Sequence, residues 1–216
     1  MSGLLVLNPN SSASVTEAVA VAARSLVPPE IPLRVDQLDD APEAIENAAQ
    51  HAAVAPMVAD HVARAVGFDA VLVACHGDPG LDRARAATDA PVVGMGAASL
   101  HAAAAIAGRF GVLTPAEGLV ERKHAQAARL GLAEQCVAVE VVGGGVLAGV
   151  GADPDLTPFI AASRRAADAG AEAVVLGCAG YAGLAGALQD AVSVRVLEPV
   201  RAAVGLLLPL CLGGGR

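Results

Sequence analysis

Aromatic residues are scarce in this sequence: its 216 residues include no tryptophan, one tyrosine and three phenylalanines. Hydrophobic residues still make up 55% of the chain, so its core must be built mainly from alanine, valine and leucine. Such small side chains suit helices that pack closely on strands. The length allows either one large domain or two compact lobes of about 100 residues each.

Basic residues are also few. The 14 lysines and arginines are outnumbered by 22 acidic residues, which leaves a formal charge of -8, and no basic cluster stands out. A surface that follows a phosphate backbone needs concentrated positive charge. We therefore expect no nucleic-acid partner.

Long hydrophobic runs are absent as well. The longest uncharged apolar run near an end covers residues 202–212, about half of the roughly 20 residues that a membrane span requires, and it contains Pro209. The first residues lack the basic start and long apolar stretch of a secretory signal, because Asn8-Pro9-Asn10 follows almost at once. We expect no membrane association and a cytoplasmic location.

Motifs for metals and nucleotide cofactors are missing. The glycine-rich segments 143–145 and 94–96 lack the spacing of a dinucleotide or P-loop fingerprint. No C-x-x-C pair and no histidine spacing suited to zinc occurs, so we predict neither cofactor nor metal. In a cytosolic setting the scattered cysteines are expected as free thiols; they are Cys75, Cys136, Cys178 and Cys211.

What the sequence does contain is an internal repeat at an offset of about 103 to 106 residues. Val6-Leu7-Asn8-Pro9 recurs as Val112-Leu113-Thr114-Pro115. Segment 68–75 matches 171–178, which brings Cys75 and Cys178 to equivalent places. Weaker matches join 33–35 to 137–141 and 91–96 to 194–199, so each half offers four strands.

These runs are short and β-branched, and alanine-rich stretches long enough for helices separate most of them, which is typical of βαβ units. We predict an α/β fold of two pseudosymmetric lobes, each a roughly four-stranded, mainly parallel sheet flanked by helices. The first lobe covers residues 1–95, and the second covers 96–196. A C-terminal helix at about 197–216 is expected to pack back on the first lobe.

Three helix starts are predicted from capping patterns. Segments 14–17 and 114–117 have the spacing of capping boxes. Asp78-Pro79 has the pattern of an N-cap followed by proline at the first helical position.

Cys75 and Cys178 are the candidate catalytic residues. Ligands of open parallel sheets bind beyond the carboxyl ends of the strands, where both cysteines lie, and a pseudo-twofold axis would turn them toward one cleft. Inverting a stereocentre by proton transfer needs one group to remove a proton and another to deliver one to the opposite face. A thiolate and a thiol fill these roles, provided one of them is biased toward thiolate.

A structural role is the alternative, because cysteine is also a common small buried hydrophobe. Cys136 and Cys211 have no counterpart in the other half, and we interpret them as structural.

Further residues are candidate substrate contacts. Asn10 and Ser11 follow the first strand, and backbone N–H groups at Gly77, Ala179 and Gly180 would lie near the thiols and bind a carboxylate or an enolate oxyanion. The alternative for the glycines is that they only permit the turn. His76 and Thr114 are two more candidate substrate contacts, each with an alternative. Strand alternation would turn His76 away from the cleft. Helix capping would explain the presence of Thr114 before Pro115, and that of Asp78 before Pro79, without any contact with substrate.

These segments together resemble the hydantoin racemase branch of the aspartate/glutamate racemase superfamily along nearly the whole chain. The resemblance is carried by 7–12 with Thr16, 74–75 with 78–81, 91–96 and 176–180. It implies two pseudosymmetric lobes with the active site in the cleft between them, no metal or pyridoxal phosphate, and Cys75 and Cys178 as the acid–base pair. It also implies a homo-oligomer that acts on a small molecule, most closely a hydantoin or allantoin.

The chain departs from that family's pattern at several positions. His76 stands where an aromatic residue is common, Ala97 where a glutamate often occurs, and Tyr181 where methionine is usual. Glu198 replaces part of an Asp-Gly pair and is a candidate specificity element. These departures leave the substrate open, as well as the thiol that acts on each enantiomer and the roles of His76, Asp78 and Glu198.

Other functions compete with this one. An aspartate/glutamate-type racemase would need basic residues for a second carboxylate, which Arg83, Arg85 or Lys123 could supply from helices. A decarboxylase or maleate isomerase on the same fold would use one thiol. A non-catalytic two-lobed binder would need none.

Overall fold

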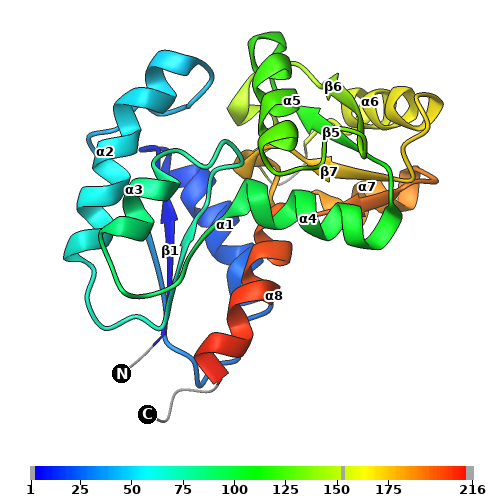
Figure 1. Ribbon diagram of the computed structural model, residues 1–216. Coiled ribbons are helices and arrows are strands. Elements are labelled where there is room, and N and C mark those ends of the chain that lie inside the picture. The colour runs from blue at the N-terminus through cyan, green and yellow to red at the C-terminus, as the bar shows by residue number, and fades with distance from the viewer. Residues whose placement is uncertain (1–2, 152–153, 213–216) are drawn as a thin grey trace.

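The computed structural model describes residues 3–151 and 154–212, and they form two lobes, each with a four-stranded parallel sheet (Figure 1). The first sheet has the order β2-β1-β3-β4 and the second β6-β5-β7-β8, so the two repeats share one topology. The predicted α/β fold with four strands in each half is confirmed, and every strand pair is parallel.

The elements of the first lobe alternate strand and helix, as the sequence pattern predicts. In chain order they are β1 (Leu4–Asn8), α1 (Ala13–Arg24), β2 (Leu33–Gln37), α2 (Ala48–Arg64), β3 (Ala70–Val73), α3 (Leu81–Ala86) and β4 (Val92–Gly94). Helix α4 (Met95–Ala107) follows β4 directly and leads to the second lobe.

The second lobe repeats this plan, with short 3₁₀ turns added. Its elements are β5 (Phe110–Thr114), η1 (Glu117–Leu119), α5 (Val120–Arg129), β6 (Cys136–Val141), η2 (Val146–Gly149), α6 (Thr157–Asp168), β7 (Ala173–Leu176), η3 (Ala179–Tyr181), α7 (Ala185–Ala191) and β8 (Arg195–Leu197). The chain ends with α8 (Pro199–Leu212), and residues 213–216 of the predicted C-terminal helix lie outside the described residues.

Alternation along the strands divides the core between the faces of the sheets. In β1, Leu5 and Leu7 pack with the apolar sides of α2 and α3, while Leu4 and Val6 pack with α1, α4 and α8. The cluster around Leu4 continues into the second lobe, where it includes residues of β7, α6 and α7. The two lobes therefore share one apolar core on this side of the molecule.

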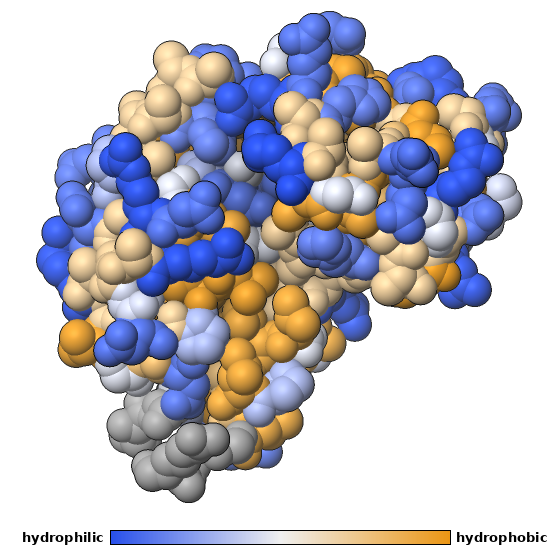
Figure 2. Space-filling view, viewed as in Figure 1, coloured by the Kyte–Doolittle hydropathy of each residue, from blue (hydrophilic) through white to orange (hydrophobic). Residues whose placement is uncertain are grey.

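Helix α8 contacts α1 and α4 as well as the strands β1, β3 and β4 of the first lobe. Figure 2 shows apolar residues gathered over this helix, where Leu206, Leu210 and Leu212 are its exposed large hydrophobic side chains. Among the described helices, none is both long enough and apolar enough to cross a membrane.

The three predicted helix starts are wrong in detail. Helix α1 begins earlier than the 14–17 pattern, because the Ser12 hydroxyl accepts from the Val15 N–H and caps it. Thr114 ends β5 and its hydroxyl has no partner among the described residues, while η1 begins three residues later at Glu117. Asp78 adopts a left-handed φ of 49°, and α3 starts after Gly80 instead.

Candidate active site

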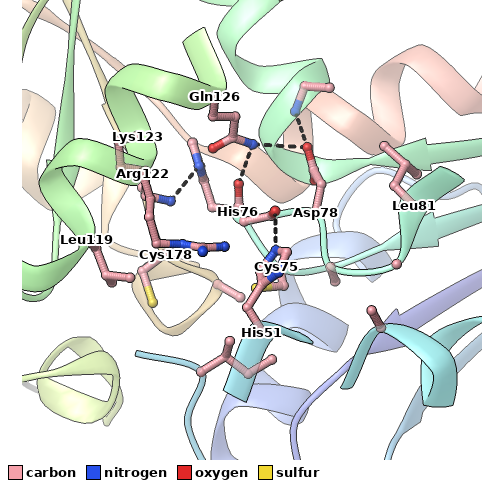
Figure 3. A pocket seen from close by; sticks show the side chains of 18 of the residues that line it. His51, Cys75, His76, Asp78, Leu81, Leu119, Arg122, Lys123, Gln126 and Cys178 are labelled. Atoms are coloured by element: carbon pink, nitrogen blue, oxygen red, sulfur yellow. Dashed lines mark hydrogen bonds between the residues drawn. The ribbon is translucent and has the colours of Figure 1, made fainter. Parts of the chain in front are cut away.

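A cavity of about 890 Å³ receives lining residues from both lobes. Its volume lies in the range of small-molecule sites. The first lobe contributes the loop after β3 and part of α2 and α3, and the second lobe contributes α5 and the loop after β7. Both Cys75 and Cys178 line it, each two residues beyond the end of its strand (Figure 3).

Cys75 is partly exposed to this cavity. Burial raises the pKa of its thiol, while the Gly77 backbone N–H, Lys123 and Arg122 lower it. Gly77 itself is held by α2, because His51 Nε2 lies 2.8 Å from the Gly77 carbonyl oxygen. Burial also lowers the pKa of His51, so this imidazole is neutral near pH 7 and donates from Nε2.

Cys178 is the more buried thiol, with 7% of its surface exposed. Burial raises its pKa to about 12, and the Gly180 backbone N–H and Lys123 only partly oppose that rise. The thiol lies 4.0 Å from the Val146 carbonyl, to which it donates a weak hydrogen bond. The environment of Cys178 thus favours the protonated form.

The two thiols have matching backbone partners. Gly77 follows Cys75 by two residues, Gly180 follows Cys178 by two, and each glycine N–H lowers the pKa of its thiol by hydrogen bonding. A side chain at Gly180 would lie 2.3 Å from the Val146 carbonyl oxygen, so only glycine fits there. The loops after β3 and β7 therefore place a glycine N–H at the same sequence position relative to each thiol, although Asp78 has a left-handed φ and the equivalent Tyr181 lies in a 3₁₀ turn.

A buried polar chain starts at Lys123, the only lysine in the sequence. Its Nζ donates to His76 Nδ1 at 2.8 Å, and His76 Nε2 faces the Ser99 hydroxyl at 3.4 Å. Burial and the Lys123 charge hold the pKa of His76 well below its usual range, so the ring is neutral. Burial lowers the pKa of Lys123 to about 8, while both thiols, when ionised, raise it.

Asp78 closes the same loop against the second lobe. Its carboxylate accepts from the Gly96 and Ala97 N–H groups at 2.9 and 2.8 Å, at the start of α4, and from the Gln126 amide of α5 at 3.1 Å. Gln126 also donates to the His76 carbonyl at 2.7 Å. Asp78 therefore caps α4 across space, and not α3, the helix that follows it in the chain.

Some predicted substrate contacts line the cavity and others do not. Asn10, His76, Gly77 and Ala179 are among its lining residues, whereas Ser11, Thr114 and Gly180 are not. Asn10 accepts from Asn8 and from the Ser12 N–H through Oδ1, which leaves its Nδ2 for a ligand. Glu198 also lies outside the lining, because its carboxylate accepts from the Val200 and Arg201 N–H groups at the start of α8.

His51, Arg122 and Gln126 were not singled out from the sequence. A signal for His51 does exist, because it lies three residues before Val54 on the helical stripe that continues through Val58 and Val62. Lys123 likewise shares the buried side of α5 with Gln126 and Ala127. A polar residue on the apolar face of a predicted helix was the available clue.

Comparison with known proteins covers nearly the whole chain. Residues 4–207 match the family model described as Asp/Glu/Hydantoin racemase. A hydantoin racemase of Rhizobium meliloti is 34% identical over 215 residues, which are 97% of this chain and 88% of the relative. A hydantoin racemase of Paenarthrobacter aurescens is 33% identical over 205 residues, 93% of this chain and 87% of the relative.

A solved structure agrees with the fold. The allantoin racemase of Klebsiella pneumoniae superposes with a TM-score of 0.91 at 30% sequence identity. The match covers 99% of this chain and 89% of that chain.

Proposed function

The chain belongs to the Asp/Glu/hydantoin racemase family and is an isomerase, and on that premise we propose that it interconverts the enantiomers of a 5-substituted hydantoin or of allantoin. The observation that carries the proposal is that Cys75 and Cys178, at equivalent ends of β3 and β7, line the same cavity from different lobes. Relatives with these substrates in their names support the choice of a cyclic ureide.

The proposed reaction is proton exchange at C5 of the ring. One thiolate takes the C5 proton, and the bond electrons pass to the neighbouring carbonyl to give an enolate. The other thiol then delivers its proton to the opposite face of C5, which restores the carbonyl and inverts the centre. Two positioned acid–base groups of this kind typically contribute about 10²- to 10⁴-fold each to the rate.

The surroundings of the thiols support an assignment of the resting state. Burial raises the pKa of both thiols, and Lys123 lowers both. At Cys75, Arg122 lowers the pKa further and Asp78 raises it, whereas at Cys178 the charges of Cys75 and Glu46 both raise it. We assign the thiolate to Cys75 and the thiol to Cys178 in the free enzyme. Lys123 acts here as a positioning residue for charge, because its cation stabilises the thiolate without contacting C5.

The test is deuterium incorporation at C5 from heavy water, followed with optical rotation, for single enantiomers of 5-substituted hydantoins and of allantoin. Non-enzymatic exchange is subtracted in each case. Cys75→Ser and Cys178→Ser are each expected to lower racemisation about 10²- to 10⁴-fold. Cys211→Ser is the matched control, because Cys211 lies on α8 outside the cavity lining.

The outcomes separate the competing functions. Dependence of activity on one thiol alone would favour the chemistry of a decarboxylase or of a cis–trans isomerase such as a maleate isomerase. Binding without exchange in the wild type would favour a non-catalytic binder. Exchange on aspartate or glutamate but on no hydantoin would make the chain an amino-acid racemase.

A further inference from the structure

The cavity is positively charged although the protein as a whole is acidic. The chain has a formal charge of -8, yet the cavity lining includes Arg83, Arg85, Arg122, Lys123 and Arg129 against only Asp78 and Asp82. Asp82 pairs with Arg85 at 3.4 Å, but 97% of its side chain is exposed, so it offers little compensation inside the cavity. A cleft lined by charge of one sign concentrates ligands of the opposite sign.

Asp78, the other acidic residue, is already occupied. Its two carboxylate oxygens accept from the Gly96 and Ala97 N–H groups and from Gln126. Burial raises its pKa to about 6, so part of its charge is lost in mildly acidic solution. Among the described residues, the side chains of Arg83, Arg122 and Arg129 therefore form no ion pair with an acidic residue of the protein.

Arg122 is the least exposed of the four arginines in the lining. It is half-buried, and among the described residues no hydrogen bond or ion pair engages its guanidinium. In the view of Figure 3 its side chain extends from α5 over the space between Cys178 and Cys75. Guanidinium groups removed from water are normally paired, with carboxylate as the partner that matches their geometry.

We propose that the substrate is a hydantoin whose C5 substituent carries a carboxylate, and that Arg122 binds this carboxylate; the proposal rests on the function proposed above. Arg129 lies on the same helix seven residues later, so it shares one side of α5 with Arg122. Arg83 faces the cavity from α3. These two side chains are exposed and add to the attraction of an anion toward the cavity.

Charge selectivity gives the sharpest test. Racemisation is measured for single enantiomers of 5-carboxymethylhydantoin and of its isosteric amide, 5-carbamoylmethylhydantoin, with the wild type, Arg122→Gln and Arg122→Lys. The wild type is expected to prefer the carboxylate. Arg122→Gln should lower the ratio of kcat/KM for carboxylate over amide about 10- to 100-fold, mainly through KM, and Arg122→Lys should restore part of it.

Arg164→Gln is the matched control, because Arg164 is exposed on α6 and lies outside the cavity lining. Its carboxylate-to-amide ratio should equal that of the wild type. An equal fall for both substrates in Arg122→Gln would assign Arg122 to the thiolate instead and overturn the proposal. A wild type that favours the amide, or that turns over allantoin in preference to both, would overturn it as well.

Calorimetric binding of 5-carboxymethylhydantoin separates this proposal from the proposed function. If no hydantoin is racemised but the carboxylate binds and Arg122→Gln weakens binding about 10-fold or more, the function fails and the anion site stands. If hydantoins are racemised by a two-thiol route but Arg122→Gln leaves carboxylate binding unchanged, the function stands and the anion site fails. Absence of carboxylate binding to the wild type would overturn the anion site under either result.

Discussion

The loops that follow β3 and β7 begin alike but differ in their surroundings. Each begins with a cysteine two residues beyond the strand, and each has a glycine N–H that lowers the pKa of the thiol. Beyond Cys75 the chain places His76 and Asp78 in a polar network with α4 and α5. At the equivalent places beyond Cys178 stand Ala179 and Tyr181, both buried in the apolar core.

This difference shows how a repeated unit can become chemically asymmetric. The proposed reaction needs two similar acid–base groups, of which only one is ionised at the start of a turnover. Burial raises the pKa of both thiols, to about 12 for Cys178, and the polar half adds Arg122 to the cations that oppose this rise at Cys75. The repeated fold supplies two equivalent thiols, and the different side chains that follow each cysteine give the two thiols different surroundings.

After the loss expected from replacing either cysteine, the largest predicted effect comes from removing the shared cation. Lys123→Met should lower kcat/KM about 10- to 100-fold at pH 7, because each unit by which the pKa of the Cys75 thiol rises removes about nine-tenths of the thiolate. The acid limb of the pH profile should move to higher pH by one unit or more. His124→Gln, an exposed neighbour on α5, is the control.

The charge of Lys123 can be followed directly, since the sequence contains no other lysine. NMR of the ¹³C-dimethylated protein should show one side-chain resonance that titrates at a pKa of about 8. An acid limb that stays in place in Lys123→Met would contradict the role assigned to this residue.

The next effect concerns thiol reactivity. Iodoacetamide at pH 8 should modify Cys75 at least about 10-fold faster than Cys178, because Cys75 is more exposed and closer to the cations that favour the thiolate. Mass spectrometry of digested samples taken over time gives both rates from one reaction. Equal rates, or faster modification of Cys178, would reverse the assigned resting state.

A smaller effect is predicted for the pH dependence of stability. Burial raises the pKa of Asp78 to about 6, so its protonated form contributes stability that is fully present below about pH 4 and is lost as the pH rises through 6. The free energy of unfolding of the wild type minus that of Asp78→Asn should therefore fall by about 1–3 kcal/mol between pH 4 and 7. Urea unfolding at both pH values measures it, and a difference that rises with pH would contradict the prediction.

The smallest effect belongs to the apolar half. The Tyr181 hydroxyl is buried and has no hydrogen-bond partner among the described residues. The Tyr181 ring packs edge to face on the Phe159 ring, with the two ring centroids 4.7 Å apart. Tyr181→Phe keeps this packing and removes the unpaired hydroxyl, so it should raise the free energy of unfolding by about 1 kcal/mol. Thermal and urea unfolding would show this, whereas a loss of stability would indicate a bonding partner for the hydroxyl.

Repetition in the sequence was sufficient to predict the strands and the placement of both cysteines, because β-branched runs and strand ends are local features. Helix starts were predicted less well. The Asp78-Pro79 pattern matches a local N-cap, but the carboxylate caps α4, which is remote in sequence. A pattern of neighbouring residues carries no information about such a partner.

The full set of residues that line the cavity could not be predicted from the sequence either. Lys123 was named as a residue that a helix could supply to the site, but the direction of its side chain depends on how α5 packs against the first lobe. Ser11 follows β1 by three residues and Thr114 ends β5, both at the expected edge of the sheets, and still they lie outside the cavity lining. A position near a strand end predicts that a residue lies close to the site. Whether its side chain lines the cavity depends on the direction in which that side chain points.

The most direct test of the two-thiol account is the isotopic composition of substrate and product early in the reaction. A single hydantoin enantiomer is incubated with the enzyme in heavy water and analysed at low conversion after chiral separation. If Cys75 removes the proton and Cys178 delivers another, the product enantiomer should carry deuterium at C5 while the recovered substrate remains almost free of it. Deuterium in the recovered substrate at a level similar to that in the product would indicate a single exchanging base and contradict the account.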